Sequence, residues 1–236
     1  VDDGTPANIH DVKFLKDHMK QIQLIPCGYH RYYYMHDEML KHGLEEFNTI
    51  GTRAQQVKQT EAELFELYKD PKLNYKPEQL TKRGGTHYSD AACECISSIY
   101  NDKRRHMVVS TQNNGAIADL PYDCIVEISS IIGGDGAMPL TWGKFNPSER
   151  GWVQIMKAME ECVIEAAITG NYGLALAAFE MNPQVEHGQV AQTVLDELLV
   201  AHKKYLPQFA DKIAELEAKG VASKDPVVMD LMVNGH

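Results

Sequence analysis

The fold class is decided by the stretch Cys124-Ile125-Val126-Glu127-Ile128-Ser129-Ser130-Ile131-Ile132, a β-branched run of the kind found in strands. It is closed by the glycine-rich turn Gly133-Gly134-Asp135-Gly136, and residues 138–142 follow as a third candidate strand that returns antiparallel. A shorter β-branched run at 107–111 leads into the turn signal Gln112-Asn113-Asn114-Gly115. Together these segments predict a small antiparallel sheet.

Segments with helical periodicity lie on both sides of this predicted sheet. The order of helices, a small sheet and further helices is typical of an α+β fold, which we expect to form one domain over residues 1–236. Asn8 is expected to cap the first helix, and Gly43 and Gly170 are expected to end two others. The predicted helices span residues 9–23, 29–42, 52–69, 91–101, 148–169 and 172–181, and one broken helix or two cover 188–219.

Charge and hydropathy argue against several functional classes. The formal net charge is −10 and the 23 Lys and Arg residues do not cluster, which argues against nucleic acid or an anionic membrane as the main partner. No apolar run approaches the ~20 residues that span a bilayer. The polar start Val1-Asp2-Asp3-Gly4 does not fit a secretory signal, and a first residue other than Met suggests a piece of a longer protein.

The cysteines show no disulfide framework. They are five in number and irregularly spaced, so we expect reduced thiols and a cytoplasmic location. Cys93 and Cys95 lie two apart in a predicted helix, where such residues do not face each other, and a metal or redox pair is not expected there. The sequence also lacks a G-x-G-x-x-G, a Walker loop, an H-E-x-x-H and a C-x-x-C motif.

A polar stretch before the sheet has the composition of a ligand-binding loop. It contains Lys82-Arg83-Gly84-Gly85 and then Tyr88-Ser89, just before a predicted helix. Paired glycines let backbone amides approach a ligand closely, and the guanidinium of Arg83 offers a planar fork of donors to phosphate or carboxylate. The alternative is an ordinary glycine turn capped by Ser89. We favour the binding loop because of what other parts of the chain resemble.

Three segments in sequence order resemble the NAD- and metal-dependent glycoside hydrolases of family four, specifically the 6-phospho-β-glucosidases. The likeness runs from about residue 9 to about residue 205 and covers only the C-terminal half of such enzymes. It implies a domain similar to the C-terminal domains of lactate and malate dehydrogenases. The matching residues are Tyr29-His30-Arg31-Tyr32-Tyr33-Tyr34-Met35, then Lys82-Arg83-Gly84-Gly85, Tyr88-Ser89 and Ala91-Ala92, then Asn113-Asn114-Gly115, Ile117, Leu120-Pro121 and Val126-Glu127-Ile128.

The resemblance implies hydrolysis of phosphorylated β-glucosides, such as cellobiose 6-phosphate, by an exception to two-carboxylate glycosidase chemistry. In this family NAD oxidises the sugar's 3-hydroxyl group to a ketone, which makes the proton on carbon 2 acidic. A base removes that proton, the glycosidic oxygen leaves, water adds, and the ketone is reduced again. NAD and a divalent metal, usually manganese, bind the family's N-terminal Rossmann half, which has no counterpart in this sequence. The resemblance therefore implies no cofactor or metal ligands in this chain, no activity of the chain alone, and a homo-oligomeric enzyme.

The resemblance also gives roles to particular residues. The family's base is a tyrosine that falls on Tyr29, and because an ordinary phenol has a pKa of about 10, it needs positive charge nearby, for example from Arg31. Arg83 is expected to bind the 6-phosphate or the sugar hydroxyls, and Arg31, Tyr88 and Ser89 are further expected substrate-binding residues. The alternative for Tyr29 is that it packs a core with its aromatic neighbours.

Three other functions remain open at this point. The chain could be an oligomerisation or regulatory domain that has kept the scaffold without the chemistry. It could belong to a 6-phospho-α-glucosidase, although Arg83-Gly84-Gly85 and Tyr88-Ser89 favour the β branch by resemblance. A dehydrogenase half is disfavoured, because the catalytic histidine of such an enzyme has no recognisable counterpart in the sequence.

Overall fold

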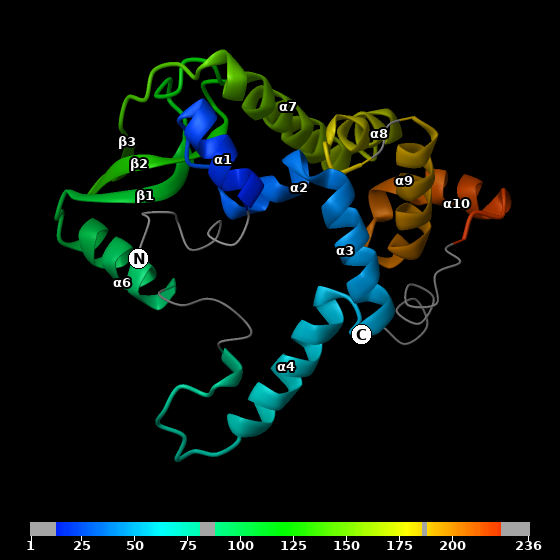
Figure 1. The fold of residues 1–236 in the computed structure, drawn as a ribbon, viewed down its shortest axis with the longest axis horizontal. Helices are drawn as coiled ribbons and strands as arrows, with labels where there is room; N and C mark the ends of the chain where they lie inside the picture. The colour runs from blue at the N-terminus through cyan, green and yellow to red at the C-terminus, as the bar shows by residue number, and fades with distance from the viewer. Residues whose placement is uncertain (1–12, 81–87, 186–187, 223–236) are drawn as a thin grey trace. The chain divides into compact units, whose positions relative to one another are not determined.

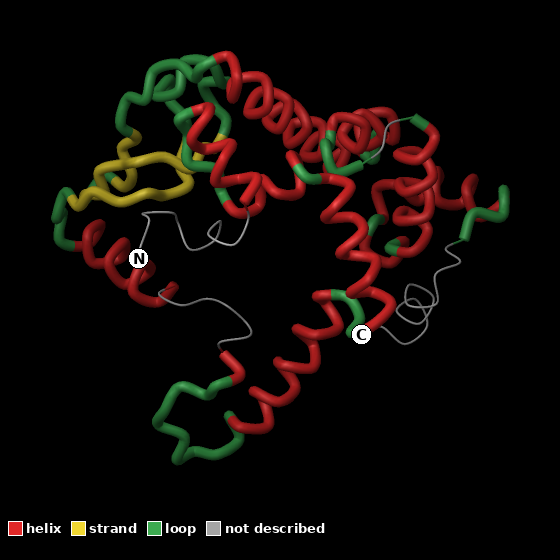
Figure 2. Tube along the Cα trace, viewed as in Figure 1, coloured by secondary structure: helices red, strands yellow, loops and turns green. Residues whose placement is uncertain are grey.

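The computed structural model describes residues 13–80, 88–185 and 188–222. These residues form helices and one three-stranded sheet, as Figures 1 and 2 show. The chain divides into two compact units, residues 1–92 and 93–236. The predicted α+β class is confirmed. None of the described helices is long and apolar enough to cross a membrane.

The first unit is helical in its described part. Thr52 caps α4, which lies within the predicted helix over 52–69: Thr52 Oγ1 accepts a hydrogen bond from the backbone N–H of Gln55, and Gln55 Oε1 accepts one from the N–H of Thr52. Asn8, the expected cap of the first helix, lies outside the described residues. The elements are α1 (Lys13–Ile22), η1 (Gly28–His30), α2 (Arg31–Tyr34), α3 (His36–Thr49) and α4 (Arg53–Leu67).

The predicted helix over 29–42 is wrong in two respects. The chain bends at Met35, whose backbone angles are φ −128° and ψ 45°, so that α2 and α3 are separate helices. Gly43 does not end α3, which continues to Thr49. A glycine ends a helix when it adopts the left-handed conformation, and Gly43 is absent from the glycines with positive φ. Gly43 therefore lies inside α3, and the prediction that it ends the helix is wrong.

The sheet confirms the predicted antiparallel arrangement. Its strands are β1 (Arg105–Gln112), β2 (Ile125–Gly133) and β3 (Gly136–Pro139), in the order β1-β2-β3. β3 begins two residues earlier than the predicted 138–142 and ends at Pro139. The pairing of Gly133 with Gly136 leaves a two-residue turn, so hydrogen bonding resumes directly after it.

The connection from β1 to β2 is organised around one buried amide. Asn113 is fully buried, and its Nδ2 donates to the carbonyl oxygens of Ile117 (3.0 Å), Leu120 (3.3 Å) and Pro121 (2.9 Å). Its Oδ1 accepts the N–H of Ile117 at 2.8 Å. Asn114 (φ 48°) and Gly115 (φ 80°) complete the predicted turn in left-handed conformations. The side chain of Asn113 thus stabilises the loop through hydrogen bonds to its backbone groups.

The second unit contains two apolar clusters, and α7 (Pro147–Thr169) contributes to both. Val153 packs against the cluster under the sheet, which includes Val126 and Ile128, whereas Ala166 belongs to a cluster formed by helices. Gly170 ends α7 as predicted, at φ 72°, where an added Cβ would lie 1.9 Å from the carbonyl oxygen of Gln208. The other elements that contain residues of this unit are α6 (Tyr88–Tyr100), which begins in the first unit, α8 (Tyr172–Met181), α9 (Gln189–Ala201), η2 (Lys203–Tyr205), η3 (Pro207–Phe209) and α10 (Ala210–Ala218).

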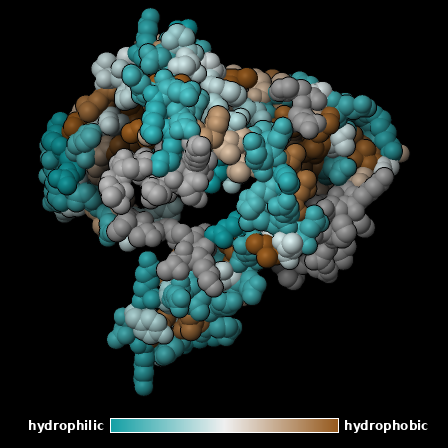
Figure 3. Space-filling view, in the orientation of Figure 1, coloured by the Kyte–Doolittle hydropathy of each residue, from teal (hydrophilic) through white to brown (hydrophobic). Residues whose placement is uncertain are grey.

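The bundle of α8, α9 and α10 leaves apolar side chains at the surface. On α9, Ala191, Leu195 and Leu199 are buried, but Val190 and Val194 beside them are exposed. Figure 3 shows brown, apolar atoms reaching the surface over this part of the molecule.

The predicted segment 188–219 forms two helices, α9 and α10, with the 3₁₀ turns η2 and η3 between them.

Tyr172 connects three helices of this bundle. Its hydroxyl group donates a hydrogen bond of 2.6 Å to Asp196 Oδ1 on α9, and Lys212 Nζ of α10 lies 4.4 Å from the ring centroid. Burial, together with the hydrogen bond and charge of Asp196, raises the pKa of Tyr172 to about 12.

We expect the free energy of unfolding to fall as the pH rises from about 10 to about 12. The folded-state pKa of Tyr172 is above its unfolded value, so its contribution is complete below the unfolded pKa and is lost as the pH rises through the folded pKa. Urea denaturation at a series of pH values measures this. Tyr172→Phe should remove this part of the pH dependence, and Tyr205→Phe, at an exposed tyrosine, should not. An alkaline loss unchanged by Tyr172→Phe would contradict the assignment.

Candidate functional site

Tyr29 lies on a short turn whose shape is set by local hydrogen bonds. Pro26 is buried, and Cys27 is extended (φ −66°, ψ 147°) before the 3₁₀ helix η1 begins at Gly28. The backbone N–H of Cys27 donates to His30 Nδ1 at 3.0 Å, and the N–H of His30 donates to the carbonyl oxygen of Cys27 at 2.9 Å. Two hydrogen bonds therefore join Cys27 to His30, and Tyr29 lies between these residues along the chain.

Arg31 strengthens the same turn from its other side. Its Nε donates to the carbonyl oxygen of Gly28 at 3.0 Å, in a partly buried position. The sequence prediction of Arg31 as a substrate-binding residue stays a prediction, because this contact is to the backbone. Its observed effect is that Gly28, the residue before Tyr29, is held by a charged side chain.

The aromatic residues around Tyr29 differ in exposure. Tyr29 is 74% exposed, and its ring stacks on that of Tyr32 with centroids 6.5 Å apart. Tyr33 and Tyr34 are half-buried and meet the ring of His30 edge-on, at 6.2 Å and 5.8 Å. The described structure thus places the phenol of Tyr29 at the surface and uses its neighbours for packing.

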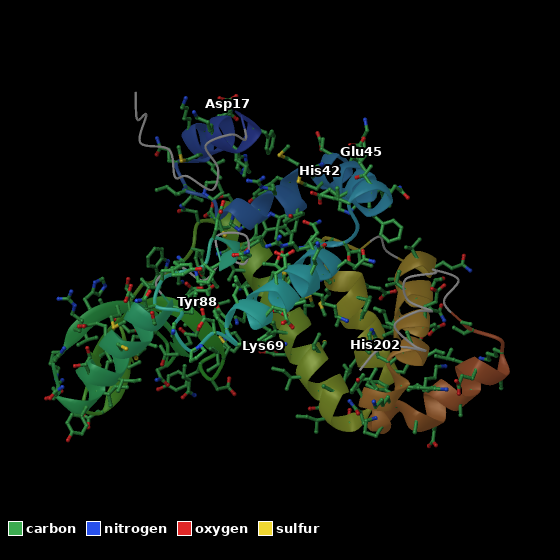
Figure 4. The ribbon with its side chains drawn as sticks, turned by 90° about the horizontal axis from the view of Figure 1, so that it is seen from below. Asp17, His42, Glu45, Lys69, Tyr88 and His202 are labelled. Atoms are coloured by element: carbon green, nitrogen blue, oxygen red, sulfur yellow. The ribbon has the colours of Figure 1, made fainter. Side chains whose placement is uncertain are left out.

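Two more of the predicted site residues lie at the beginning of α6. Tyr88, which Figure 4 labels, and Ser89 are its first two residues. Both are exposed, Tyr88 to 77%. Arg83, with the whole stretch 81–87, lies outside the described residues. The structure therefore brings Tyr29 together with Arg31 on one turn, and Tyr88 together with Ser89 on another. That the two pairs share one cleft stays a prediction.

One residue of functional interest, His30, did not emerge from the sequence. In the sequence His30 is one member of an aromatic segment, whereas in the structure its Nδ1 accepts the backbone N–H of Cys27. Burial lowers its pKa, and the nearby His18 lowers it further, which favours the neutral ring that such a hydrogen bond needs. The signal that could have indicated this role is the position of His30 in the sequence, three residues after Cys27 at a break marked by Pro26.

The described residues do not form a metal centre of their own. Among residues 13–80, 88–185 and 188–222, no three His, Cys, Asp or Glu side chains gather in a group that could hold a metal ion. All five cysteines are free thiols. The donor groups present here therefore do not fit a protein-bound divalent metal without ligands from elsewhere.

Comparison with known proteins identifies the relatives of this chain. The model of the "Family 4 glycosyl hydrolase C-terminal domain" matches residues 2–185. A "Probable 6-phospho-beta-glucosidase" of Bacillus subtilis is 52% identical over 209 residues, which are 89% of this chain and 47% of that protein. By contrast, the "Phospho-alpha-glucosidase PagL" of Clostridium acetobutylicum is 26% identical over 188 residues, which are 78% of this chain and 41% of that protein.

A solved structure agrees with this match. It is a 6-phospho-β-glucosidase of Thermotoga maritima, determined with manganese, NAD⁺ and glucose-6-phosphate. It has a TM-score of 0.74 and 33% identity, over 84% of this chain and 46% of that one. The chain thus spans about half the length of the relatives it matches.

Proposed function

Since the chain belongs to family 4 of the glycosyl hydrolases, whose C-terminal domain it forms, we propose that it is the catalytic and substrate-binding half of a 6-phospho-β-glucosidase. The substrates would be phosphorylated β-glucosides such as cellobiose 6-phosphate. The Bacillus subtilis relative named for β-linked substrates is 52% identical to this chain, and the Clostridium acetobutylicum phospho-α-glucosidase is 26% identical, which supports the β branch.

The chain's part in the reaction is a proton transfer. The ionised Oη of Tyr29 accepts the proton from carbon 2 of the sugar after carbon 3 has become a ketone, and the electron pair of the broken C–H bond expels the glycosidic oxygen from carbon 1. The observation that carries this assignment is the combination of an exposed phenol with a backbone held on both sides by hydrogen bonds. A general base needs both access to the substrate and a restricted position.

Recognition of the phosphorylated sugar is assigned to the remaining predicted residues. Arg83 binds the 6-phosphate through its planar fork of N–H donors. Tyr88 and Ser89 supply exposed hydroxyl groups at the first turn of α6, where the helix dipole also favours an anion. Arg31 adds positive charge beside Tyr29.

We assign the binding of NAD and of a divalent metal to the N-terminal half of the complete enzyme. The Thermotoga maritima structure contains both. The described residues of this chain offer no group of metal ligands, so the chain's own chemistry is limited to binding, orienting and proton transfer. The isolated chain should accordingly be inactive.

We assign an oligomeric assembly and a cytoplasmic location to the complete enzyme. Leu40 and Leu44 of α3 are half-exposed, and no residue of α3 is buried within the described chain, so this helix has apolar surface for another subunit or domain to cover. Five free thiols fit a reducing compartment.

The phosphate assignment predicts a substrate-dependent effect of Arg83→Ala. We define the complete enzyme as this chain joined behind the N-terminal half of the Bacillus subtilis relative. Loss of a hydrogen-bonded charge pair costs about 1.5–3 kcal/mol, which is about a 10- to 150-fold rise in KM for the phosphorylated substrate. KM for the unphosphorylated glucoside should stay within about twofold, and steady-state kinetics on both substrates measures the difference.

Arg83→Lys is the matched variant, because it keeps the positive charge but loses the planar fork of donors. Its KM for the phosphorylated substrate should lie between those of the wild type and Arg83→Ala. Equal rises in KM for both substrates would remove Arg83 from the phosphate site. A complete enzyme with no activity on cellobiose 6-phosphate would overturn the proposed function itself.

A further inference from the structure

We propose that His30 is a positioning residue for Tyr29, which it holds in place by accepting the backbone N–H of Cys27 across the turn. This inference rests on the proposed function, because it names a second residue that the same proton transfer requires. His30 does not touch the reacting atoms in this account, and its effect passes through the backbone of residues 27–30.

The geometry of the turn makes Nδ1 of His30 a backbone cap. In a capping box, a side chain three residues into a helix reaches back to the N–H of the residue that caps it, and this side chain is usually Glu or Gln. Here the distance from Cys27 N to His30 Nδ1 is 3.0 Å, and the N–H of His30 returns to the carbonyl oxygen of Cys27 at 2.9 Å. Both bonds span Gly28 and Tyr29.

The imidazole that forms this cap is itself held in place. Its ring meets Tyr33 and Tyr34 edge-on, with centroids 6.2 Å and 5.8 Å away. Tyr34 in turn lies 4.6 Å from the ring of His18 on α1, and His18 stacks on Phe14. The cap is therefore connected to the packing of another helix, which limits how far the turn can move.

Besides the His30 cap, the backbone beside Tyr29 is held by Arg31, whose Nε donates to the carbonyl oxygen of Gly28 at 3.0 Å. The ring of Tyr29 itself is largely in solvent beside Tyr32, so the position of its hydroxyl group depends on this backbone. A reacting group displaced by about 1 Å loses about 100-fold in rate. Loss of the Cys27–His30 bond should therefore reduce the rate of proton removal more than it reduces substrate binding.

His30→Phe and His30→Gln in the complete enzyme separate the acceptor from the ring. The phenylalanine keeps an aromatic ring against Tyr33 and Tyr34 but has no acceptor, whereas the glutamine loses the ring and keeps an acceptor of the usual capping-box type. For His30→Phe we expect kcat to fall about 10- to 100-fold with KM for cellobiose 6-phosphate unchanged within about twofold. His30→Gln should recover kcat to within about threefold of the wild type.

His106→Phe, at an exposed histidine of β1, is the control for a histidine-to-phenylalanine change and should leave kcat and KM unchanged. His30→Leu replaces His30→Phe if the latter does not yield folded protein. Three results would overturn the inference while the wild type remains active: full kcat without the acceptor, an equal effect on KM, or a glutamine variant as slow as the phenylalanine variant. An inactive wild-type enzyme would overturn the proposed function, and this inference with it.

Discussion

Tyr29→Phe is expected to lower the kcat of the complete enzyme by about 100- to 10,000-fold, the range that a positioned general base contributes. The change removes one oxygen atom and keeps the ring that stacks on Tyr32 at 6.5 Å, so the turn should retain its shape. NAD binding should be unchanged, because this chain is not assigned any part of the nucleotide site. Turnover of cellobiose 6-phosphate, with NAD affinity measured by fluorescence titration, gives both quantities.

Tyr32→Phe is the matched control. It removes the same hydroxyl group from the stacked neighbour on α2, which is 43% exposed. We expect its kcat to stay within about threefold of the wild type, because a surface substitution away from a specific contact has little effect. Equal losses in the two variants would indicate that the aromatic pair binds the sugar and that Tyr29 is not the base.

Asn113→Asp should destabilise the second unit severely. The substitution keeps the shape of the side chain but replaces an amide that donates to three carbonyl oxygens, at 2.9–3.3 Å, by an acceptor-only carboxylate. An uncompensated charge in a fully buried position costs about 3–5 kcal/mol. Urea denaturation at pH 7 measures the free energy of unfolding.

The pH dependence of this variant tests the cause. Burial and the facing carbonyl oxygens should raise the folded-state pKa of the introduced carboxyl group above its unfolded value of about 3.9. The destabilisation should then be smaller near pH 4 and grow as the pH rises. Asn114→Asp, at the exposed neighbouring position with φ 48°, should change stability by less than about 0.5 kcal/mol. Similar losses at both positions would contradict the role given to the Asn113 network.

The elements that sequence predicted well are those whose ends are determined locally. Thr52 and Gln55 form a capping box, and Gly170 adopts the left-handed conformation that ends a helix, so α4 and α7 lie where expected. Gly43 carried the same kind of signal without that conformation, because the helix-forming segment 44–46 follows it, whereas Gly170 is followed by Asn171, which caps the next helix. The break at Met35 has no proline or glycine to announce it.

The candidate site was predictable only in part, for a similar reason. Resemblance selected Tyr29, but its exposure depends on how Tyr33, Tyr34 and His30 pack, and that information is not in the spacing of residues. The capping role of His30 is unusual for its residue type, since Glu or Gln normally occupies that position. Asn113 was recognised as part of a turn, whereas its burial and its three carbonyl partners follow from the path of the loop.

The most direct test of the central claim is the exchange of the hydrogen on carbon 2 of the sugar with solvent. The complete enzyme is incubated with cellobiose 6-phosphate in D₂O, and deuterium at carbon 2 of the recovered sugar is measured by NMR. If Tyr29 removes this proton, the wild-type enzyme incorporates deuterium and Tyr29→Phe incorporates none above the enzyme-free background. Incorporation by Tyr29→Phe at the wild-type rate would show that another group is the base and would contradict the account.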